Sequence, residues 1–329
     1  MNINQIDRSL LSSGNTNEIK SVYQDTFRDM GFAYVRNHGI SPQRIDRLSE
    51  LSRVFFDLEL SEKNKIAMKN SGLAWRGYFP VGAELTSGKA DQKEGLYFGK
   101  EHLDDHLGVQ NSWPLHGKNQ WPDHPLLKDF SEEVLQYLAE IESLARDLMK
   151  GFAISLDLPD DYFAKRFQDA TTLFRIFNYP KHKACSENLW GVGEHTDMGF
   201  LTVLHQDQSG GLEARLRDGN WIPIPPIEDT FVINIGDMME FWTHGYYRAT
   251  PHRVKNLADG DRLSIPFFYD PCWTASLEPI DKNLLQVGDD AEGHERWDGL
   301  NLRELPKDMT YGDFVWNKVK DVFPDLAEG

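Results

Sequence analysis

Apolar side chains in the first part of the chain recur at spacings of three and four residues, the period of a helix with one buried face. The pattern predicts an amphipathic helix over residues 16–30, a short strand over 32–35, and a second helix that Ser41 caps. Ser61 is expected to begin a third, short helix. Residues 72–121 lose this period and gain glycine, proline and aromatic residues, so we expect a long ordered loop with short strands.

The longest apolar stripe runs through residues 125–156 and predicts a helix of many turns. The same stripe would suit a dimer seam, but a single helix that braces a sheet is the simpler interpretation. Beyond Asp160 the pattern changes to short apolar segments separated by turns, and residues 311–323 can form a closing helix. The expected strands are 172–179, 200–206, 211–216, 221–223, 230–235, 238–243, 248–254 and 263–269. Many short, evenly spaced strands favour a β-sandwich or barrel, and a jelly roll is the natural candidate.

Charge and composition exclude several kinds of partner. The 52 acidic and 35 basic residues among 329 give a formal charge of −17, which would repel nucleic-acid phosphates and anionic lipid head groups. Only two cysteines occur, too few for a disulfide framework in a chain of this length. Neither a signal sequence nor an apolar run long enough for a bilayer is present. We therefore expect a cytoplasmic protein, with a monomer favoured and no nucleic-acid or membrane partner.

Three residues form a candidate metal site. His195 and Asp197 lie two positions apart, so on an extended segment both side chains can point towards one ion. His252 lies in a strand-like run that could direct it into the barrel. Two histidines and a carboxylate make up the facial triad that suits ferrous iron. Taken alone, the His-x-Asp triplet is often a polar loop, and a lone histidine in a strand is usually a core or surface residue.

Two residues beyond the candidate metal site, Arg262 and Ser264, are candidates for binding a carboxylate. Arg262 and Ser264 share one face of a predicted apolar strand, and a buried arginine is costly without an anionic partner. A guanidinium offers a forked pair of donors to a carboxylate, and a hydroxyl adds one more. A bound dicarboxylate would explain both residues together with the metal, whereas a buried salt bridge to one of the many acidic residues stays open as the alternative.

The order and spacing of five motifs resemble the isopenicillin-N-synthase-like branch of the 2-oxoglutarate- and iron(II)-dependent dioxygenases. The motifs are the run Gly193–Gly199, Gly210-Gly211-Leu212, Asn234-Ile235-Gly236-Asp237, His252-Arg253-Val254 and Arg262-Leu263-Ser264. The resemblance implies an α+β, mainly β fold: a double-stranded β-helix (a cupin-like jelly roll) braced by N-terminal and long central helices. Residues 1–124 are then a mostly helical region with substrate-side loops, 125–272 the brace helix and oxygenase core, and 273–329 a C-terminal extension with the closing helix.

The resemblance also implies roles for particular residues. The iron ligands are then His195, Asp197 and His252, and the distal carboxylate of 2-oxoglutarate is held by Arg262, Ser264 and Tyr179. Phe177 departs from the asparagine of many plant relatives, so the cosubstrate pocket is expected to differ in detail.

Substrate-facing residues are drawn from two sources. Phe268, Tyr78 and Arg175 match positions that face the substrate in relatives. Trp75 and Arg76, which like Tyr78 lie in the aromatic loop region, are further pocket candidates, although loop aromatics more often pack against a core. No catalytic side chain beyond the metal ligands is expected.

The implied activity is an oxygenase that couples decarboxylation of 2-oxoglutarate to succinate with oxidation of a small organic substrate. Hydroxylation is the default outcome, and demethylation, desaturation or ring closure stay open. Fe(II), 2-oxoglutarate and O2 are the implied cofactors and cosubstrates, with ascorbate as a reductant. Two alternatives remain: an iron oxidase of the same fold that does not use 2-oxoglutarate, and a non-catalytic jelly-roll ligand binder.

Overall fold

Two β-sheets form the centre of the molecule. The computed structural model describes residues 3–86, 88–181, 190–255, 259–285, 302–306 and 308–323. In spatial order, the large sheet consists of β1 (Gln5–Asp7), β2 (Phe32–Arg36), β12 (Phe231–Ile235), β9 (Leu201–Gln206), β14 (Arg262–Cys272), β7 (Ala170–Tyr179), β6 (Glu94–Phe98) and β3 (Gly77–Phe79). The small sheet consists of β11 (Trp221–Pro223), β10 (Leu212–Arg215), β13 (His252–Val254) and β8 (Val192–His195), and a separate hairpin pairs β4 (Leu85–Thr86) with β5 (Lys89–Ala90).

The chain alternates between the two sheets from β7 to β14. Strands β7, β9, β12 and β14 lie in the large sheet, whereas β8, β10, β11 and β13 lie in the small one. Their pairings are antiparallel throughout. This alternation is the double-stranded β-helix, so the expected jelly-roll fold is confirmed.

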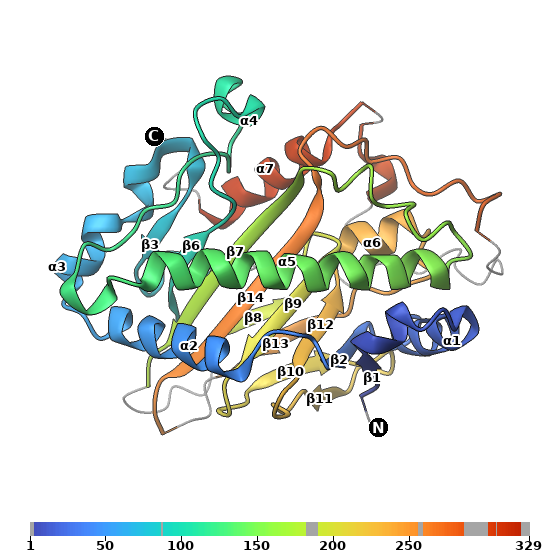
Figure 1. The fold of residues 1–329 in the computed structure, drawn as a ribbon, viewed down its shortest axis with the longest axis horizontal. Helices are drawn as coiled ribbons and strands as arrows, with labels where there is room; N and C mark the ends of the chain where they lie inside the picture. The colour runs from blue at the N-terminus through green and yellow to red at the C-terminus, as the bar shows by residue number, and fades with distance from the viewer. Residues whose placement is uncertain are drawn as a thin grey trace.

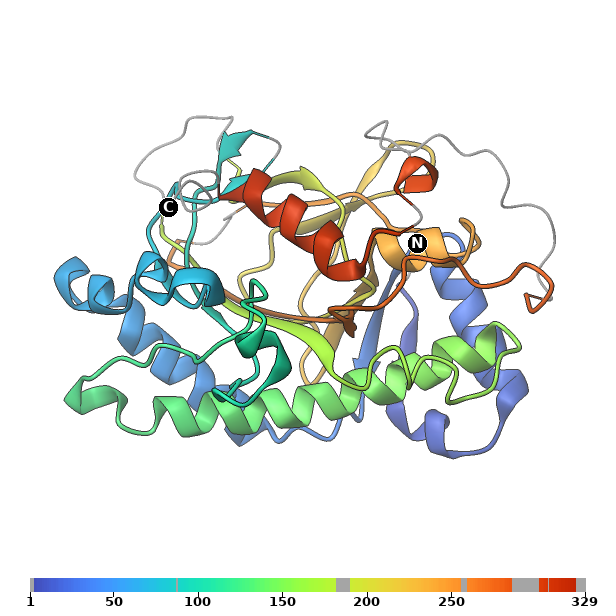
Figure 2. The same cartoon turned by 90° about the horizontal axis from the view of Figure 1, so that it is seen from above.

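Helices cover the outer face of the large sheet (Figure 1). The long helix α5 (Phe130–Ser155) crosses the strands, and α1 (Thr16–Phe27) and α2 (Pro42–Phe56) pack beside it. Helix α7 (Tyr311–Val322) lies on the opposite side of the sheet from α5 (Figure 2). The shorter elements are α3 (Leu60–Lys63), α4 (Leu107–Gln110), α6 (Asp237–Trp242), η1 (Arg8–Ser12), η2 (Asn64–Ile66), η3 (Met68–Ala74), η4 (Pro125–Leu127) and η6 (Leu302–Glu304).

The brace helix follows its apolar stripe. Val134, Ile141 and Leu148 are fully buried at a spacing of seven residues, which keeps them on one face of α5. Aromatic rings then join α5 to α1, since the Phe152 and Tyr23 ring centroids lie 4.9 Å apart, edge to face. The predicted helix is therefore confirmed as a support of the sheet.

Most predicted strands begin and end within two residues of the observed bounds, but the strand expected over residues 248–254 comprises only His252–Val254. The Ser41 hydroxyl accepts a hydrogen bond from the Arg44 backbone N–H at 3.2 Å, so it caps α2 as predicted. Helix α3 begins one residue earlier than expected, with Glu59 in the N-cap position. Among the described residues, no helix is long and apolar enough to cross a membrane.

The strand predicted over residues 238–243 is wrong, because this segment forms helix α6. Met238, Met239 and Trp242 are its buried apolar residues, at positions i, i+1 and i+4, which suits a helix as well as a short strand. Strand β8 was not among the predicted strands, although an extended segment was considered for His195 and Asp197. Strands β1 and β2 extend one edge of the large sheet, and β6 and β3 extend the other, so residues 1–124 contribute to the same sheet as the core. The division of the chain into three regions, 1–124, 125–272 and 273–329, stays a prediction.

Candidate metal and cosubstrate site

A cavity of about 400 Å³ lies between the inner faces of the two sheets. Side chains point inwards at every second position of a strand, and the two longest strands supply most of one wall. The lining residues on these strands are Arg262, Ser264, Pro266, Phe268 and Asp270 from β14, and Leu173, Arg175, Phe177 and Tyr179 from β7. A volume of this size is typical of a small-molecule site.

His195, Asp197 and His252 meet at the wall formed by the small sheet. His195 ends β8 and His252 begins β13, and the two residues are direct partners across the antiparallel pair. Their ring centroids lie 4.2 Å apart. Asp197 Oδ1 lies 3.9 Å from His195 Nε2 and 3.7 Å from His252 Nε2. The three ligand atoms predicted from sequence are therefore gathered around one point.

The tautomers of the two histidines suit a metal. His195 Nδ1 lies 2.8 Å from the Gly193 carbonyl oxygen, and His252 Nδ1 lies 3.0 Å from the Thr250 carbonyl oxygen. A carbonyl oxygen only accepts, so each Nδ1 carries the proton and donates it. Each Nε2 then keeps its lone pair towards Asp197, which is the usual orientation of metal-binding histidines. Burial and the neighbouring His252 lower the pKa of His195, against the opposing effect of Asp197.

Two polar residues hold the Asp197 carboxylate. Its Oδ2 accepts hydrogen bonds from Thr202 Oγ1 at 2.5 Å and from Asn234 Nδ2 at 2.7 Å, which leaves Oδ1 directed towards the histidines. Burial would raise the pKa of Asp197, but the two histidines and these two donors outweigh it and keep the pKa below its usual value. The carboxylate is therefore charged and oriented.

The loop that carries Asp197 is fixed by the start of α6. The Asp237 N–H donates to the Asp197 carbonyl oxygen at 2.8 Å, and the Met238 N–H donates to the Gly199 carbonyl oxygen at 3.0 Å. A Cβ at Gly236 would lie 2.4 Å from that Gly199 oxygen, so glycine is required for the close approach. The first N–H groups of α6, which have no partner within the helix, thus hold the loop that carries Asp197.

Arg262 lies at another part of the cavity and has unused donors. Its side chain is fully buried, and Nε donates to the Gly210 carbonyl oxygen at 2.7 Å. Both terminal guanidinium nitrogens are buried without a hydrogen-bond partner, and no acidic side chain pairs with them in the described parts of the chain. The guanidinium carbon lies 4.8 Å from the centroid of the Tyr179 ring, and Ser264 faces the same space. The salt-bridge alternative is therefore not observed, and two buried donors fit an incoming carboxylate.

The expected substrate residues divide into two groups. Arg175 and Phe268 line the cavity. Tyr78 does not. It is the cross-strand partner of Leu96, and Leu96 is the partner of Ile176. Cross-strand partners share one face of the sheet, and Ile176 lies on the opposite face of β7 from Arg175, so Tyr78 points away from the cavity. The Tyr78 hydroxyl instead donates to a Glu94 carboxylate oxygen at 2.7 Å.

Trp75 and Arg76 also lie outside the cavity lining. The Trp75 ring packs edge to face on Trp316, with centroids 5.1 Å apart. An Arg76 terminal nitrogen donates to the Leu115 carbonyl oxygen at 2.8 Å. The expectation that Trp75, Arg76 and Tyr78 line the pocket is therefore not met, and the alternative of packing against the core describes all three.

Several cavity residues were not foreseen. Thr202 and Asn234 face the cavity from neighbouring strands, and strand alternation would have marked both as inward once the strands were paired. Glu84 and Lys93 also line it, from the region of the chain without regular periodicity, and Lys318 lines it from α7.

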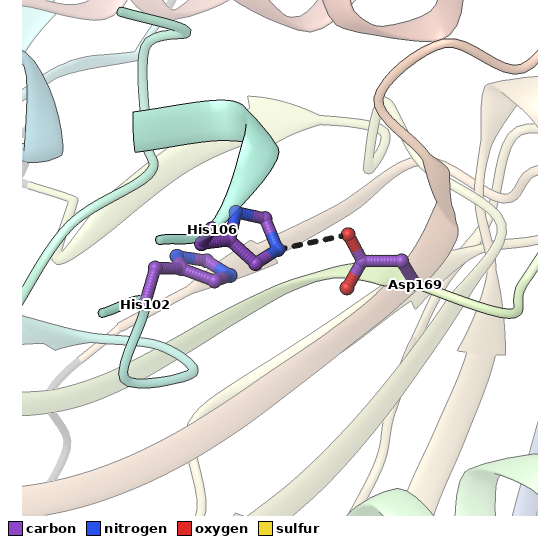
Figure 3. Close-up of side chains that lie close together, drawn as sticks. All are labelled: His102, His106 and Asp169. Atoms are coloured by element: carbon purple, nitrogen blue, oxygen red, sulfur yellow. Dashed lines mark hydrogen bonds and ion pairs between the residues drawn. The ribbon is translucent and has the colours of Figure 1, made fainter. Parts of the chain in front are cut away.

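A second group of metal-type side chains lies elsewhere: His102, His106 and Asp169 (Figure 3). His106 Nε2 lies 3.1 Å from Asp169 Oδ2. Here, however, backbone N–H groups donate to the Nδ1 atoms, from Gly108 to His106 at 3.0 Å and from Gly117 to His102 at 3.3 Å. The neutral rings then carry their protons on Nε2, the reverse of the arrangement at His195 and His252. This group is a hydrogen-bonded network rather than a prepared metal site.

Comparisons with known proteins agree with this geometry. The profile of the 2OG-Fe(II) oxygenase superfamily matches residues 170–271, and that of the non-haem dioxygenase N-terminal region, described for morphine synthesis, matches residues 3–124. A protein of Dictyostelium discoideum described as a probable iron/ascorbate oxidoreductase is 43% identical, covering 94% of this chain and 90% of that protein. A homoarginine-6-hydroxylase of Arabidopsis thaliana is 34% identical, covering 92% of this chain and 80% of that protein.

Solved structures give the same result. The crystal structure of a full-length Neurospora crassa protein in complex with 2-oxoglutarate (alpha-KG) superposes with a TM-score of 0.75 at 25% identity, covering 87% of this chain and 92% of that one. The chain belongs to the 2OG-Fe(II) oxygenase superfamily. It is an Fe(II)- and 2-oxoglutarate-dependent oxygenase, an oxidoreductase that acts on a small molecule. This finding excludes the alternative of a non-catalytic ligand binder.

Proposed function

We propose that His195, Asp197 and His252 are the three protein ligands of Fe(II). The supporting observation is the pair of Nε2 lone pairs and the free Asp197 Oδ1, all directed to one point inside the cavity. Two imidazoles and one carboxylate leave open positions on the metal for a cosubstrate and oxygen. The protons on the two Nδ1 atoms fix the ring orientations without competing with the metal.

Arg262, Ser264 and Tyr179 hold the distal carboxylate of 2-oxoglutarate in this proposal. The two unpartnered terminal nitrogens of Arg262 donate to the carboxylate oxygens, while the bond from Nε to Gly210 fixes the plane of the guanidinium. Ser264 supplies a hydroxyl from the same strand face. Phe177, the cross-strand partner of Ser264, lines the same cavity with an apolar ring.

The bound iron, with 2-oxoglutarate and O2, supplies the oxidation of a substrate C–H bond, with hydroxylation as the default outcome and release of succinate and CO2. The chain's own residues bind, orient and exclude water. Helix α7 and the β4–β5 hairpin contribute Lys318, Val322, Leu85 and Thr86 to the cavity lining, opposite the sheet. Arg175 and Phe268 lie on the substrate side of the cavity in this assignment.

The test is succinate release from 2-oxoglutarate, measured with and without Fe(II) over a panel of small organic substrates. Wild-type protein is expected to need Fe(II), and the Asp197→Ala variant to lose turnover. Turnover that persists in Asp197→Ala would make the metal assignment wrong. Oxygen consumption with a substrate but without 2-oxoglutarate would instead favour the iron oxidase of the same fold.

The remaining expectations form part of the same proposal. They are a cytoplasmic location, a monomer, and no nucleic-acid or membrane partner, and the formal charge of −17 supports the last of these. Ascorbate would serve as a reductant that keeps the iron ferrous. Size-exclusion chromatography with light scattering tests the monomer.

A further inference from the structure

The cavity contains a second arginine, Arg175, at a distance from Arg262. Strand pairing places Tyr179 of β7 directly opposite Arg262 of β14. Arg175 lies four residues before Tyr179 on the same face of β7, which separates their backbones by about 13 Å at about 3.3 Å per residue. The two arginines therefore enter the cavity from different parts of its wall, and a short dicarboxylate bound to Arg262 leaves Arg175 for another ligand.

Aromatic rings fix the plane of the Arg175 guanidinium. Its central carbon lies 4.2 Å from the centroid of the Tyr97 ring and 4.9 Å from that of the Phe268 ring. Tyr97 comes from β6 and Phe268 from β14, the two strands that flank β7. With rings packed on it from both sides, the guanidinium meets a ligand through its edge, where the N–H donors are.

Among the described residues, Glu84 is the acidic partner of Arg175, through a long ion pair. Its NH1 lies 3.5 Å from Glu84 Oε1, which also accepts a hydrogen bond from the Tyr97 hydroxyl at 2.7 Å. The other Glu84 oxygen lies 2.8 Å from the Lys93 ammonium group. The Nε of Arg175 is buried and has no hydrogen-bond partner among the described residues. Glu84 thus holds Arg175 in place without using all of its donors.

The position of Arg175 relates it to the reaction centre. Phe268, which packs on the guanidinium, is the cross-strand partner of Thr202, and Thr202 donates to the Asp197 carboxylate. Leu173 and Val322 add apolar surface to the same cavity. A ligand anchored at Arg175 would therefore lay its hydrocarbon body over Phe268, towards the metal triad.

We propose that Arg175 binds a carboxylate of the substrate, so that the enzyme selects small organic acids with an apolar or aromatic body. This inference rests on the proposed function, because it assigns the substrate to the part of the cavity that 2-oxoglutarate leaves open. Arg175 is then a specificity-determining residue that touches the substrate.

The test compares acids with their primary amides on the same carbon skeleton, such as phenylacetate with phenylacetamide and hexanoate with hexanamide. Protein loaded anaerobically with Fe(II) and saturating 2-oxoglutarate, which fills the Arg262 end, is titrated with each compound by calorimetry. In at least one pair the acid is expected to bind about 10- to 100-fold more tightly than the amide, the range for hydrogen bonds to charged groups. Arg175→Gln is expected to reduce that preference to within about two-fold.

Lys318→Gln is the matched control, because it removes another cation of the cavity lining and is expected to keep the preference. Equal affinities of acid and amide in every pair would overturn the inference, as would a preference that survives in Arg175→Gln. The wild-type comparison needs no variant and stands even if Arg175→Gln fails to fold. Failure of the proposed function is recognised separately, as failure of wild-type protein to bind Fe(II) and 2-oxoglutarate, and the acid preference is then read on the metal-free protein.

Discussion

Removing the Thr202 hydroxyl is expected to weaken Fe(II) binding without altering any metal ligand. Thr202→Val replaces the hydroxyl with a methyl group of similar size, so the packing of β9 is kept while the 2.5 Å hydrogen bond to Asp197 Oδ2 is lost. Asn234 still donates to the same oxygen at 2.7 Å. Asp197 therefore remains in the cavity, with one of its two side-chain donors missing.

The magnitude follows from the two bonds. A hydrogen bond to a charged group is worth about 1.5–3 kcal/mol, and about 1.4 kcal/mol corresponds to a ten-fold change in an equilibrium constant. Because Asn234 still restrains the carboxylate, we expect the lower end, an increase of about 10-fold in the Kd for Fe(II). A Thr202→Val/Asn234→Leu double variant loses both donors and is expected to reach about 100-fold.

The assay is an anaerobic competition titration of Fe(II) between protein and a chelator, with thermal unfolding of the metal-free variants as a check on folding. Thr202→Ser is the matched control, because it keeps the hydroxyl and loses only the methyl group, and it is expected to bind Fe(II) like wild type. The reasoning is refuted if Thr202→Val is as stable as wild type and its Kd stays within about two-fold. It is also refuted if Thr202→Ser raises the Kd for Fe(II) as much as Thr202→Val does.

Three further changes separate the roles assigned to other residues. Arg262→Gln is expected to raise the KM for 2-oxoglutarate by about 100-fold while Fe(II) affinity is unchanged, since the change removes a forked donor pair and no metal ligand; steady-state succinate assays check this, and an unchanged KM contradicts it. Tyr78→Phe is expected to lower the free energy of unfolding by about 1–2 kcal/mol through loss of the bond to Glu94, with the KM for 2-oxoglutarate unaltered, as urea unfolding and kinetics together would reveal. Burial lowers the pKa of His205 from 6.5 to about 4, so the unfolded chain takes up its proton first and stability is lost as pH falls from 6.5 towards 4. Between pH 8 and pH 5, protonation of this histidine is expected to lower the free energy of unfolding of wild type by on the order of 2 kcal/mol, a loss that His205→Gln does not show. Equal losses of wild type and His205→Gln in urea unfolding would argue against this.

Periodicity predicted the elements that bury one regular face. Helix α5 was foreseen because its apolar positions repeat with a period of 3.6 over 26 residues. The strands β7, β9, β12 and β14 were foreseen as short, mostly apolar runs separated by turns. Helix α6 was missed because its four apolar residues, Met238, Met239, Phe241 and Trp242, are too few to distinguish a helix from a short strand. Strand β8 was missed because the backbone hydrogen bonds to β13, rather than an apolar pattern, make its polar sequence a strand.

The candidate site was predictable where one short motif carries its own geometry, as with His195 and Asp197. The orientation of Tyr78 was not, because the face on which a strand residue points depends on the register with its neighbours, and a shift of one residue reverses it. Thr202 and Asn234 approach Asp197 through the pairing of β9 with β12, which a single sequence does not reveal. Arg175 and Glu84 come together in the same way, from segments far apart in the chain.

Binding of 2-oxoglutarate to the iron-loaded protein tests the central assignment most directly. Under anaerobic conditions, 2-oxoglutarate that chelates protein-bound Fe(II) produces a visible charge-transfer absorption, which can be titrated in wild type and in Asp197→Ala. The account predicts that this absorption saturates at one equivalent of 2-oxoglutarate in wild type and is absent in Asp197→Ala. An absorption of equal intensity in both proteins, or none in wild type, would contradict the assignment of His195, Asp197 and His252 as the iron site.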